Sequence, residues 1–185
     1  MTSGAISARE VMQQLAGQLA VFMALLLLAS GLHKLIRRRR TETVIHAFAG
    51  VPRGAAPLAA VATAAAETAA AAMLWIPAYR AAGALLAALL WAGYLALILR
   101  AIAQGRRDVD CGCSFGSARH PLGSYQAARN GLLIGAALLV SGVAMSGLAP
   151  GVSAAQVLGA CALLALYGAL DASMSLTAPR AGALS

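Results

Sequence analysis

Two cysteines stand one residue apart in the stretch RRDVDCGCSFGSARHP, residues 106–121. A disulfide between Cys111 and Cys113 closes a small, strained ring, and Gly112 relieves part of that strain by reaching backbone angles that other residues avoid. Strained disulfides are more oxidising and exchange more readily than relaxed ones. The pair is therefore predicted to carry out thiol–disulfide exchange, in which one cysteine attacks as the thiolate and the other resolves the mixed disulfide.

The surroundings of the pair leave two other interpretations open. Basic residues at 106, 107, 119 and 120 favour the reactive thiolate, whereas Asp108 and Asp110 oppose it. Two reduced loop cysteines without a role are one alternative. Zinc or copper held by Asp110, Cys111, Cys113 and His120 is the other. Structural zinc sites usually space paired cysteines by two to four residues and add a second pair, so we expect no metal here.

The elements that must position this pair are apolar helices. The chain has 185 residues, of which 61% are hydrophobic and only 11% are charged, against about 25% charged in soluble domains. A soluble fold of this size cannot bury so much apolar surface, so we predict an all-α helical bundle in a membrane, with one domain over residues 1–185.

The net charge of +8 comes from arginines clustered between apolar runs. That pattern argues against a nucleic-acid partner and favours contact with membrane lipid.

Five runs are long enough to cross a membrane, which takes about 20 apolar residues per helix. They cover residues 15–36, 55–76, 81–103, 127–147 and 152–176, and the second, mostly alanine, is the least hydrophobic. The polar start of the chain and the length of the first run favour a retained span over a cleaved signal peptide. Short turns with Pro and Gly join the second run to the third and the fourth to the fifth, which predicts two pairs of antiparallel neighbours.

The distribution of basic residues predicts the orientation. The chain has 14 lysines and arginines. All except Arg9 and Arg80 lie in the connections that follow the first and third runs, in the helix ends beside these connections, or in the C-terminal tail. Basic residues stay preferentially on the cytoplasmic side of a membrane. We therefore expect a multi-pass protein of the inner membrane with a periplasmic N-terminus, a cytoplasmic C-terminus and the cysteine pair on the cytoplasmic face.

A single carboxylate, Glu67, stands in the middle of the second run. An ionisable group at that depth is expensive, and it either marks a functional site or is buried against a partner. The candidate partners are Ser30, His33 and Lys34 in the first run and Tyr94 in the third. Structural bracing between helices and a proton or quinone site remain equally open at this stage.

Other polar residues lie at the ends of the runs. Lys34 is interpreted as a residue that extends towards the headgroups, and His33 as a hydrogen-bonded packing residue. Arginines 37–40 are a topology signal that contacts anionic lipid. Arg129 and Asn130 either fold back over the segment with the thiols or cap the fourth run. Cys161, inside the last run, is predicted to be a small packing residue.

Four motifs together resemble the methylamine utilisation protein MauE family and the wider MauE/DoxX group of redox-associated membrane proteins. They are SGLHKL at the end of the first run, Glu67, DCGCSFG, and RNGLL at the start of the fourth run. The resemblance covers residues 16–139. It implies a role in the processing, export or disulfide-dependent maturation of the light subunit of methylamine dehydrogenase, with a thioredoxin-like MauD-type partner.

The site expected from the residues and the resemblance has Cys111 and Cys113 as its reactive pair. Its supporting polar residues are Glu67, His33, Lys34, Asp110, Arg129 and Asn130. Two further interpretations stay open: a non-redox membrane scaffold for the thioredoxin-like partner, and a thiol oxidoreductase that binds a quinone. No other cofactor is expected.

The predicted orientation and the implied client lie on opposite sides of the membrane. The resemblance implies a periplasmic light subunit, whereas the arginines predict a cytoplasmic cysteine pair. Either the pair passes electrons across the membrane, or one run does not span, or the thiols do not contact the mature subunit directly.

Overall fold

The described part of the chain is all-α. A computed structural model describes residues 7–105, 124–147 and 151–177, with side chains to residue 173. These ranges hold six α-helices and one 3-10 turn, and no strand. The elements are α1 (Ala8–Ile36), α2 (Arg38–Ala49), α3 (Ala56–Trp75), η1 (Pro77–Tyr79), α4 (Arg80–Ala103), α5 (Ser124–Met145) and α6 (Ala154–Thr177).

Five of these helices are long and apolar enough to cross a membrane: α1, α3, α4, α5 and α6. They coincide with the five predicted runs, and α3 has the lowest hydropathy of the five, as the sequence indicated. Helix α1 begins earlier than its apolar run because Ser7 caps it: the Glu10 amide donates to Ser7 Oγ over 3.2 Å, and the Ser7 amide donates to the Glu10 carboxylate over 2.8 Å. The chain is a multi-pass membrane protein.

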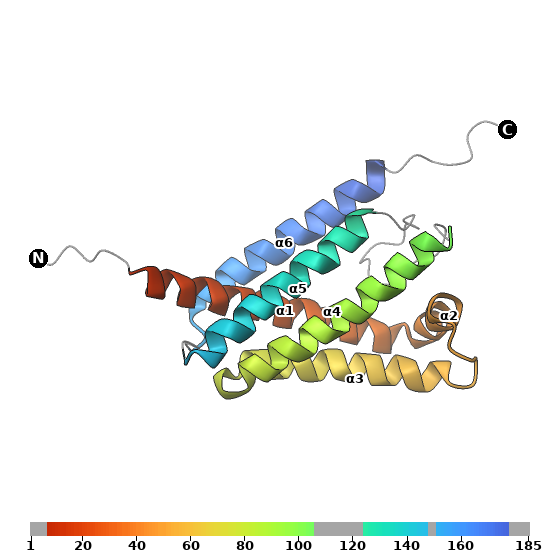
Figure 1. Cartoon of the computed structure of the whole chain (residues 1–185), viewed down its shortest axis with the longest axis horizontal. Coiled ribbons are helices and arrows are strands. Elements are labelled where there is room, and N and C mark those ends of the chain that lie inside the picture. Colours follow the sequence, from red (N-terminus) through yellow and green to blue (C-terminus); the bar gives the residue numbers. More distant parts are fainter. Residues whose placement is uncertain (1–6, 106–123, 148–150, 178–185) are drawn as a thin grey trace, which may run out of the picture.

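The spanning helices run alternately up and down (Figure 1). One end of the bundle carries α2, the start of α3, the end of α4, the start of α5 and the end of α6, and is called the α2 end below. The opposite end carries the α3–α4 turn and the α5–α6 connection. The antiparallel contact predicted between α3 and α4 is confirmed. Helices α4 and α5 also pack closely, although the long segment 106–123 separates them in sequence.

Helix α6 packs mainly on α1, so the prediction that α5 and α6 are direct neighbours was incomplete. The two run antiparallel and side by side in Figure 1, but the close backbone approach of α6 is to α1. Two glycines make it possible. A Cβ at Gly159 would stand 2.6 Å from Gln18 Nε2, and one at Gly17 would overlap the side-chain amide of Gln156. Small residues at such crossings let helix backbones come together.

Helix α2 was not predicted, because its segment was interpreted as a polar connection. It ends at Ala49, followed by Gly50 with a φ of 72°, the left-handed conformation in which helices often terminate. Phe48 packs against Ile98 and Ala101 of α4, and α2 also lies against α3. It has no fully buried residue and covers the end of the bundle.

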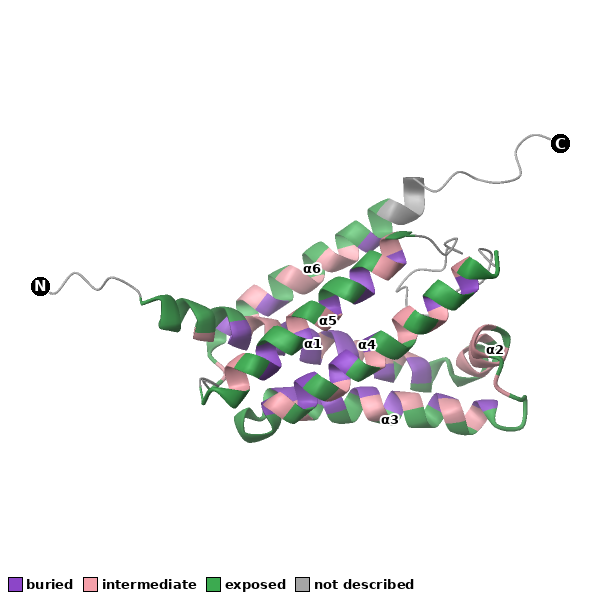
Figure 2. Cartoon of the chain, viewed as in Figure 1, coloured by how far each residue is buried: buried purple, intermediate pink, exposed green. Residues whose placement is uncertain are grey.

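The core lies along the middle of α1, and the outer helices show much of their surface (Figure 2). Large apolar side chains such as Leu132 and Leu158 are more than two-thirds exposed, at 76% and 72%. In a membrane protein such faces meet lipid. Cys161 is also exposed, on α6, so the prediction that it packs inside the bundle was wrong.

Candidate functional site

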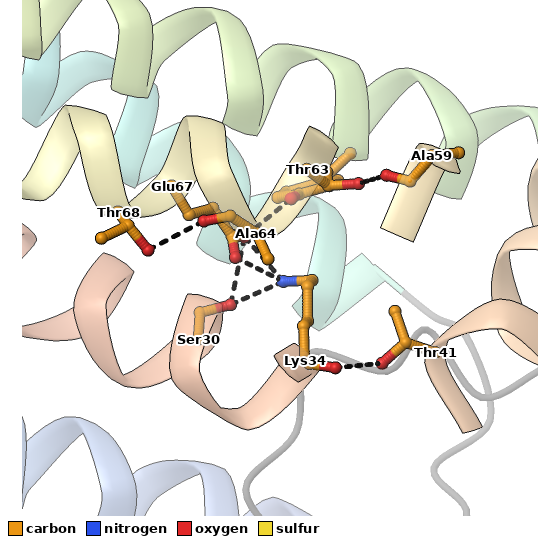
Figure 3. A network of polar contacts seen from close by, with 9 residues as sticks. Ser30, Lys34, Thr41, Ala59, Thr63, Ala64, Glu67 and Thr68 are labelled. Atoms are coloured by element: carbon orange, nitrogen blue, oxygen red, sulfur yellow. Dashed lines mark hydrogen bonds and ion pairs between the residues drawn. The ribbon is translucent and has the colours of Figure 1, made fainter. Parts of the chain in front are cut away.

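A buried ion pair joins α1 to α3. Lys34 Nζ lies 2.6 Å from Glu67 Oε1 and 2.8 Å from Oε2 (Figure 3). The Glu67 side chain is 1% exposed and that of Lys34 10%. A charge in an apolar environment is tolerated only when it is paired and hydrogen-bonded. Lys34, interpreted from sequence as extending towards the headgroups, instead turns inward to Glu67.

Two hydroxyl groups complete the network around Glu67. Ser30 Oγ donates to Glu67 Oε1 over 3.1 Å and accepts from Lys34 Nζ over 2.7 Å. The Tyr94 hydroxyl donates to the same Oε1 over 2.7 Å, and Lys34 Nζ stands 5.4 Å from the centre of the Tyr94 ring. Three of the four predicted partners of Glu67 are confirmed as contacts, and they connect α1, α3 and α4. His33 lies outside this network.

Local sequence explains why these groups meet. Ser30 and Lys34 are four residues apart, so they share one face of α1. Gly31 lies between them against α3, where a Cβ would stand 2.9 Å from Thr68 Oγ1 and 3.1 Å from the Ala64 carbonyl oxygen. This close approach brings the α1 face directly over Glu67. Thr41 Oγ1 of α2 donates to the Lys34 carbonyl over 3.4 Å and links the end of α1 to α2.

Among the described residues, each donor group of this network has an acceptor. The three N–H bonds of an ammonium group match the three acceptors around Lys34, namely Ser30 Oγ and the two Glu67 oxygens. Glu67 Oε1 accepts three hydrogen bonds and Oε2 one. The Lys34 ammonium already neutralises the charge of Glu67, so protonation of the carboxylate would give up this ion pair. Of the two interpretations that the sequence left open, the geometry favours bracing.

A second buried ion pair joins α5 to α6. Arg129 Nη1 lies 2.9 Å from Asp171 Oδ1, and each side chain is about nine-tenths buried, at 8% and 10% exposed. The Arg129 guanidinium also stands 5.7 Å from the centre of the Tyr167 ring, within reach of a cation–π contact. Asp171 was missed in the sequence analysis. The argument that singled out Glu67, an acidic residue inside an apolar run, applies to it equally.

The described contacts of Arg129 and Asn130 lie within α5 and between α5 and α6, and the alternative that they fold back over the segment with the thiols involves residues outside the described ranges. Arg129 points sideways to α6, and Asn130 Nδ2 donates to the Gln126 carbonyl one turn earlier, over 2.8 Å. Both residues are buried. They stabilise the first turns of α5, the helix that follows the segment with the thiols.

Cys111, Cys113 and Asp110 lie outside the described residues, as does His120 of the zinc alternative. Thiol exchange and the metal alternative therefore stay predictions. The neighbours of the segment are described: α4 ends at Ala103 and α5 begins at Ser124, both at the α2 end of the bundle. Arg129, in the second turn of α5, is also at that end.

Comparison with known families decides the assignment. The family model described as methylamine utilisation protein MauE matches residues 12–144. The chain belongs to the MauE family. The match covers α1 to α5 almost completely, including Lys34, Glu67, Tyr94 and Arg129, and leaves α6 with Asp171 outside it. MauE membership confirms the resemblance inferred from the motifs and implies a role in methylamine utilisation. Neither a curated protein nor a solved structure matches the chain.

Proposed function

We propose that this MauE-family protein assists the processing, export or disulfide-dependent maturation of the methylamine dehydrogenase light subunit, through thiol–disulfide exchange at Cys111 and Cys113. The observation that carries the proposal is the position of the Cys-Gly-Cys pair in sequence, between two spans whose adjoining ends lie together at the α2 end. A membrane bundle restricts where the pair can move. It therefore raises the local concentration of thiols for any client held at the same surface.

The exchange step conserves electrons. The thiolate of one cysteine attacks a sulfur of a client disulfide, a mixed disulfide forms, and the other client sulfur leaves as a thiolate. In isomerisation, that client thiolate attacks a second client disulfide and frees another client thiolate. This new thiolate attacks the mixed disulfide and releases the cysteine of the pair. In reduction, the second cysteine of the pair attacks the mixed disulfide, and the pair ends oxidised. A thioredoxin-like MauD-type partner then returns two electrons to it.

The two ion pairs have supporting roles in this proposal. Lys34 and Glu67 hold α1, α3 and α4 together, and Arg129 with Asp171 fixes the start of α5 to α6. These contacts keep the two helix ends beside the thiol segment in a constant relation. Asp110, next to Cys111, would lower the fraction of thiolate, and Asn130 supports the start of α5.

We further infer that the α2 end faces the cytoplasm and that the N-terminus is periplasmic. Among the described residues, Lys34, arginines 37–40, Arg53, Arg100 and Arg129 lie at the α2 end, whereas Arg9 and Arg80 lie at the other. Because five helices are long enough to span, the alternative that one run does not cross is disfavoured. The thiols would then meet the light subunit before or during export, or pass electrons across the membrane.

Serine substitutions test the thiol chemistry. Cys111→Ser and Cys113→Ser are each expected to abolish light-subunit maturation while the protein still inserts in the membrane. Cys161→Ser is the matched control and should leave maturation unchanged. The readouts are the amount of active methylamine dehydrogenase and the amount of this protein in the membrane fraction. Normal enzyme levels in both Cys111→Ser and Cys113→Ser cells would remove the thiols from the mechanism.

Thiol labelling of intact cells tests the orientation. With Cys161→Ser as background, a membrane-impermeant maleimide should leave Cys111 and Cys113 unlabelled until the cells are opened. Labelling in intact cells would place the pair in the periplasm. That result would contradict the inferred orientation while leaving direct exchange with the periplasmic subunit possible.

A non-redox scaffold is the second candidate, and the Lys34–Glu67 network favours it. Every polar group of that network is engaged in joining helices, which suits a rigid platform for a thioredoxin-like partner. In this case deletion of the whole protein prevents maturation, whereas the serine variants support it normally.

A further inference from the structure

The junction of α1 and α2 exposes four consecutive arginines. Helix α1 ends at Ile36, Arg37 breaks the helix with φ −103° and ψ 38°, and α2 begins at Arg38. All four side chains at this junction are exposed. We call these residues the arginine elbow: Arg37, Arg38, Arg39 and Arg40.

Among the described residues, an acidic side chain forms an ion pair with the elbow at Arg38. The one acidic residue of α2 is Glu42, whose Oε1 lies 2.8 Å from Arg38 Nε. This pair is on the surface, with the Arg38 side chain 55% exposed, where salt bridges are weak. Helix α2 also begins without a side-chain cap and without an acidic residue in its first turn. The partial positive charge of its backbone N–H groups therefore adds to that of the arginines.

Exposed apolar side chains lie directly before the arginines. Leu32, Leu35 and Ile36, in the last turn and a half of α1, are 54%, 48% and 74% exposed. Since α1 spans the membrane, these side chains meet acyl chains. The surface thus changes from apolar to strongly basic within one residue, between Ile36 and Arg37. That is the order in which a phospholipid presents its acyl chain and its phosphate.

The elbow is held in place from within the bundle. Helix α2 turns away from the direction of α1 and lies across the bundle end (Figure 1). Phe48 packs on Ile98 and Ala101, and Thr41 Oγ1 donates to the Lys34 carbonyl. The arginine backbone is therefore ordered before any ligand arrives, which lowers the entropic cost of binding.

We propose that the arginine elbow binds the headgroup of one anionic phospholipid, with an acyl chain along Leu32, Leu35 and Ile36. A guanidinium group forms paired hydrogen bonds to phosphate oxygens, a geometry that an ammonium group cannot reproduce. The exposed apolar turn distinguishes a lipid from free phosphate or from an acidic protein segment, neither of which would cover it. This site is independent of the thiol chemistry proposed above.

Native mass spectrometry of the purified full-length protein tests the site. The protein is released from nanodiscs of phosphatidylcholine that contain increasing fractions of phosphatidylglycerol, and the retained lipids are counted. Wild type should retain one phosphatidylglycerol in preference to phosphatidylcholine. In Arg37→Gln/Arg39→Gln this retention should fall about 25-fold, since each basic residue near an anionic surface contributes about fivefold. Absence of selective retention by the wild type would overturn the proposal.

Two further variants separate the site from general effects of charge. Arg53→Gln/Arg100→Gln removes two other exposed arginines from the same end and should retain the lipid. Equal loss in this control would mean diffuse attraction and no site at the elbow. Arg37→Lys/Arg39→Lys keeps the charges that set the topology but removes the paired geometry, so it should insert normally and lose several-fold in retention. Unchanged retention in the lysine variant would contradict guanidinium–phosphate pairing.

Inorganic phosphate distinguishes a lipid site from a general anion site. Phosphate at millimolar concentration should leave the bound phosphatidylglycerol in place, and Ile36→Ser should weaken lipid retention. Displacement by phosphate, together with unchanged retention in Ile36→Ser, would show that the elbow binds free anions only and would reject the lipid.

Discussion

Lys34 and Glu67, 33 residues apart in sequence, form a bidentate ion pair with N–O distances of 2.6 and 2.8 Å inside the bundle. The pair places a negative charge in the least hydrophobic span and its counter-charge in the last turn of α1. Such a pair adds little net stability, because burying both charges costs nearly as much as their attraction returns. Removing one partner is costly, since the other charge is then left buried.

Lys34→Met and Glu67→Met should each destabilise the protein by about 3–5 kcal/mol, the usual cost of an uncompensated buried charge. The double variant Lys34→Met/Glu67→Met should recover most of this loss, because it leaves no charge behind. Thermal unfolding of the purified protein in one detergent measures all three. Glu42→Gln, which removes the exposed pair with Arg38, is the control and should change stability by less than about 1 kcal/mol. A double variant as unstable as the single variants would contradict a simple brace.

Asp171→Ala should loosen α6 from α5, because few backbone contacts join these two helices and the buried ion pair between Arg129 and Asp171 would be lost. We expect a loss of about 3 kcal/mol and faster amide hydrogen exchange in the C-terminal half of α6 and the first turns of α5. Leu170→Ala, at an exposed neighbouring position, should leave exchange unchanged. Equal exchange in Asp171→Ala and wild type would mean that the contact of α6 with α1 suffices to hold it.

Gly83→Ala and Gly93→Ala test close packing within one helix. A Cβ at Gly83 would stand 2.7 Å from Met73 Cβ and 2.8 Å from the Leu74 backbone nitrogen, and backbone cannot move aside cheaply. We expect a loss of about 1–3 kcal/mol, as for other overpacked sites. A Cβ at Gly93 meets nothing within 4 Å, so this substitution should be neutral or gain up to about 1 kcal/mol from helix propensity. Equal unfolding temperatures for the two variants would contradict the α3–α4 contact.

Cys161 should resist water-soluble thiol reagents in the membrane. Its side chain is exposed on α6, about 10 Å along the helix from Ala154 at about 1.5 Å per residue, which is within the hydrocarbon layer. In the Cys111→Ser/Cys113→Ser background, a charged maleimide should label the protein only after the membrane is dissolved and the chain unfolded. Rapid labelling in intact membranes would mean that this face of α6 borders water.

Several features were predictable from sequence because they depend on short stretches of chain. Helix length and hydrophobicity identified the five spans, and the position of Glu67 in an apolar run identified it as a residue in need of partners. Helix α2 escaped prediction because its arginine-rich start hides a short amphipathic pattern in only 12 residues. Asp171 escaped prediction because Arg129 was interpreted only as a neighbour of the thiol segment or as a helix cap. The partner of Arg129 stands 42 residues further along the chain, in another helix.

The sequence by itself determined that the protein is a five-span membrane bundle of the MauE family with a thiol pair between two spans. Only the tertiary structure decided that Glu67 meets Ser30, Lys34 and Tyr94 but not His33, that Arg129 meets Asp171, and that α6 packs on α1. The physical reason is that hydrophobic length is a property of each helix alone. The rotation and spacing of two helices depend instead on where small residues let the two backbones touch, as at Gly31 and Gly83.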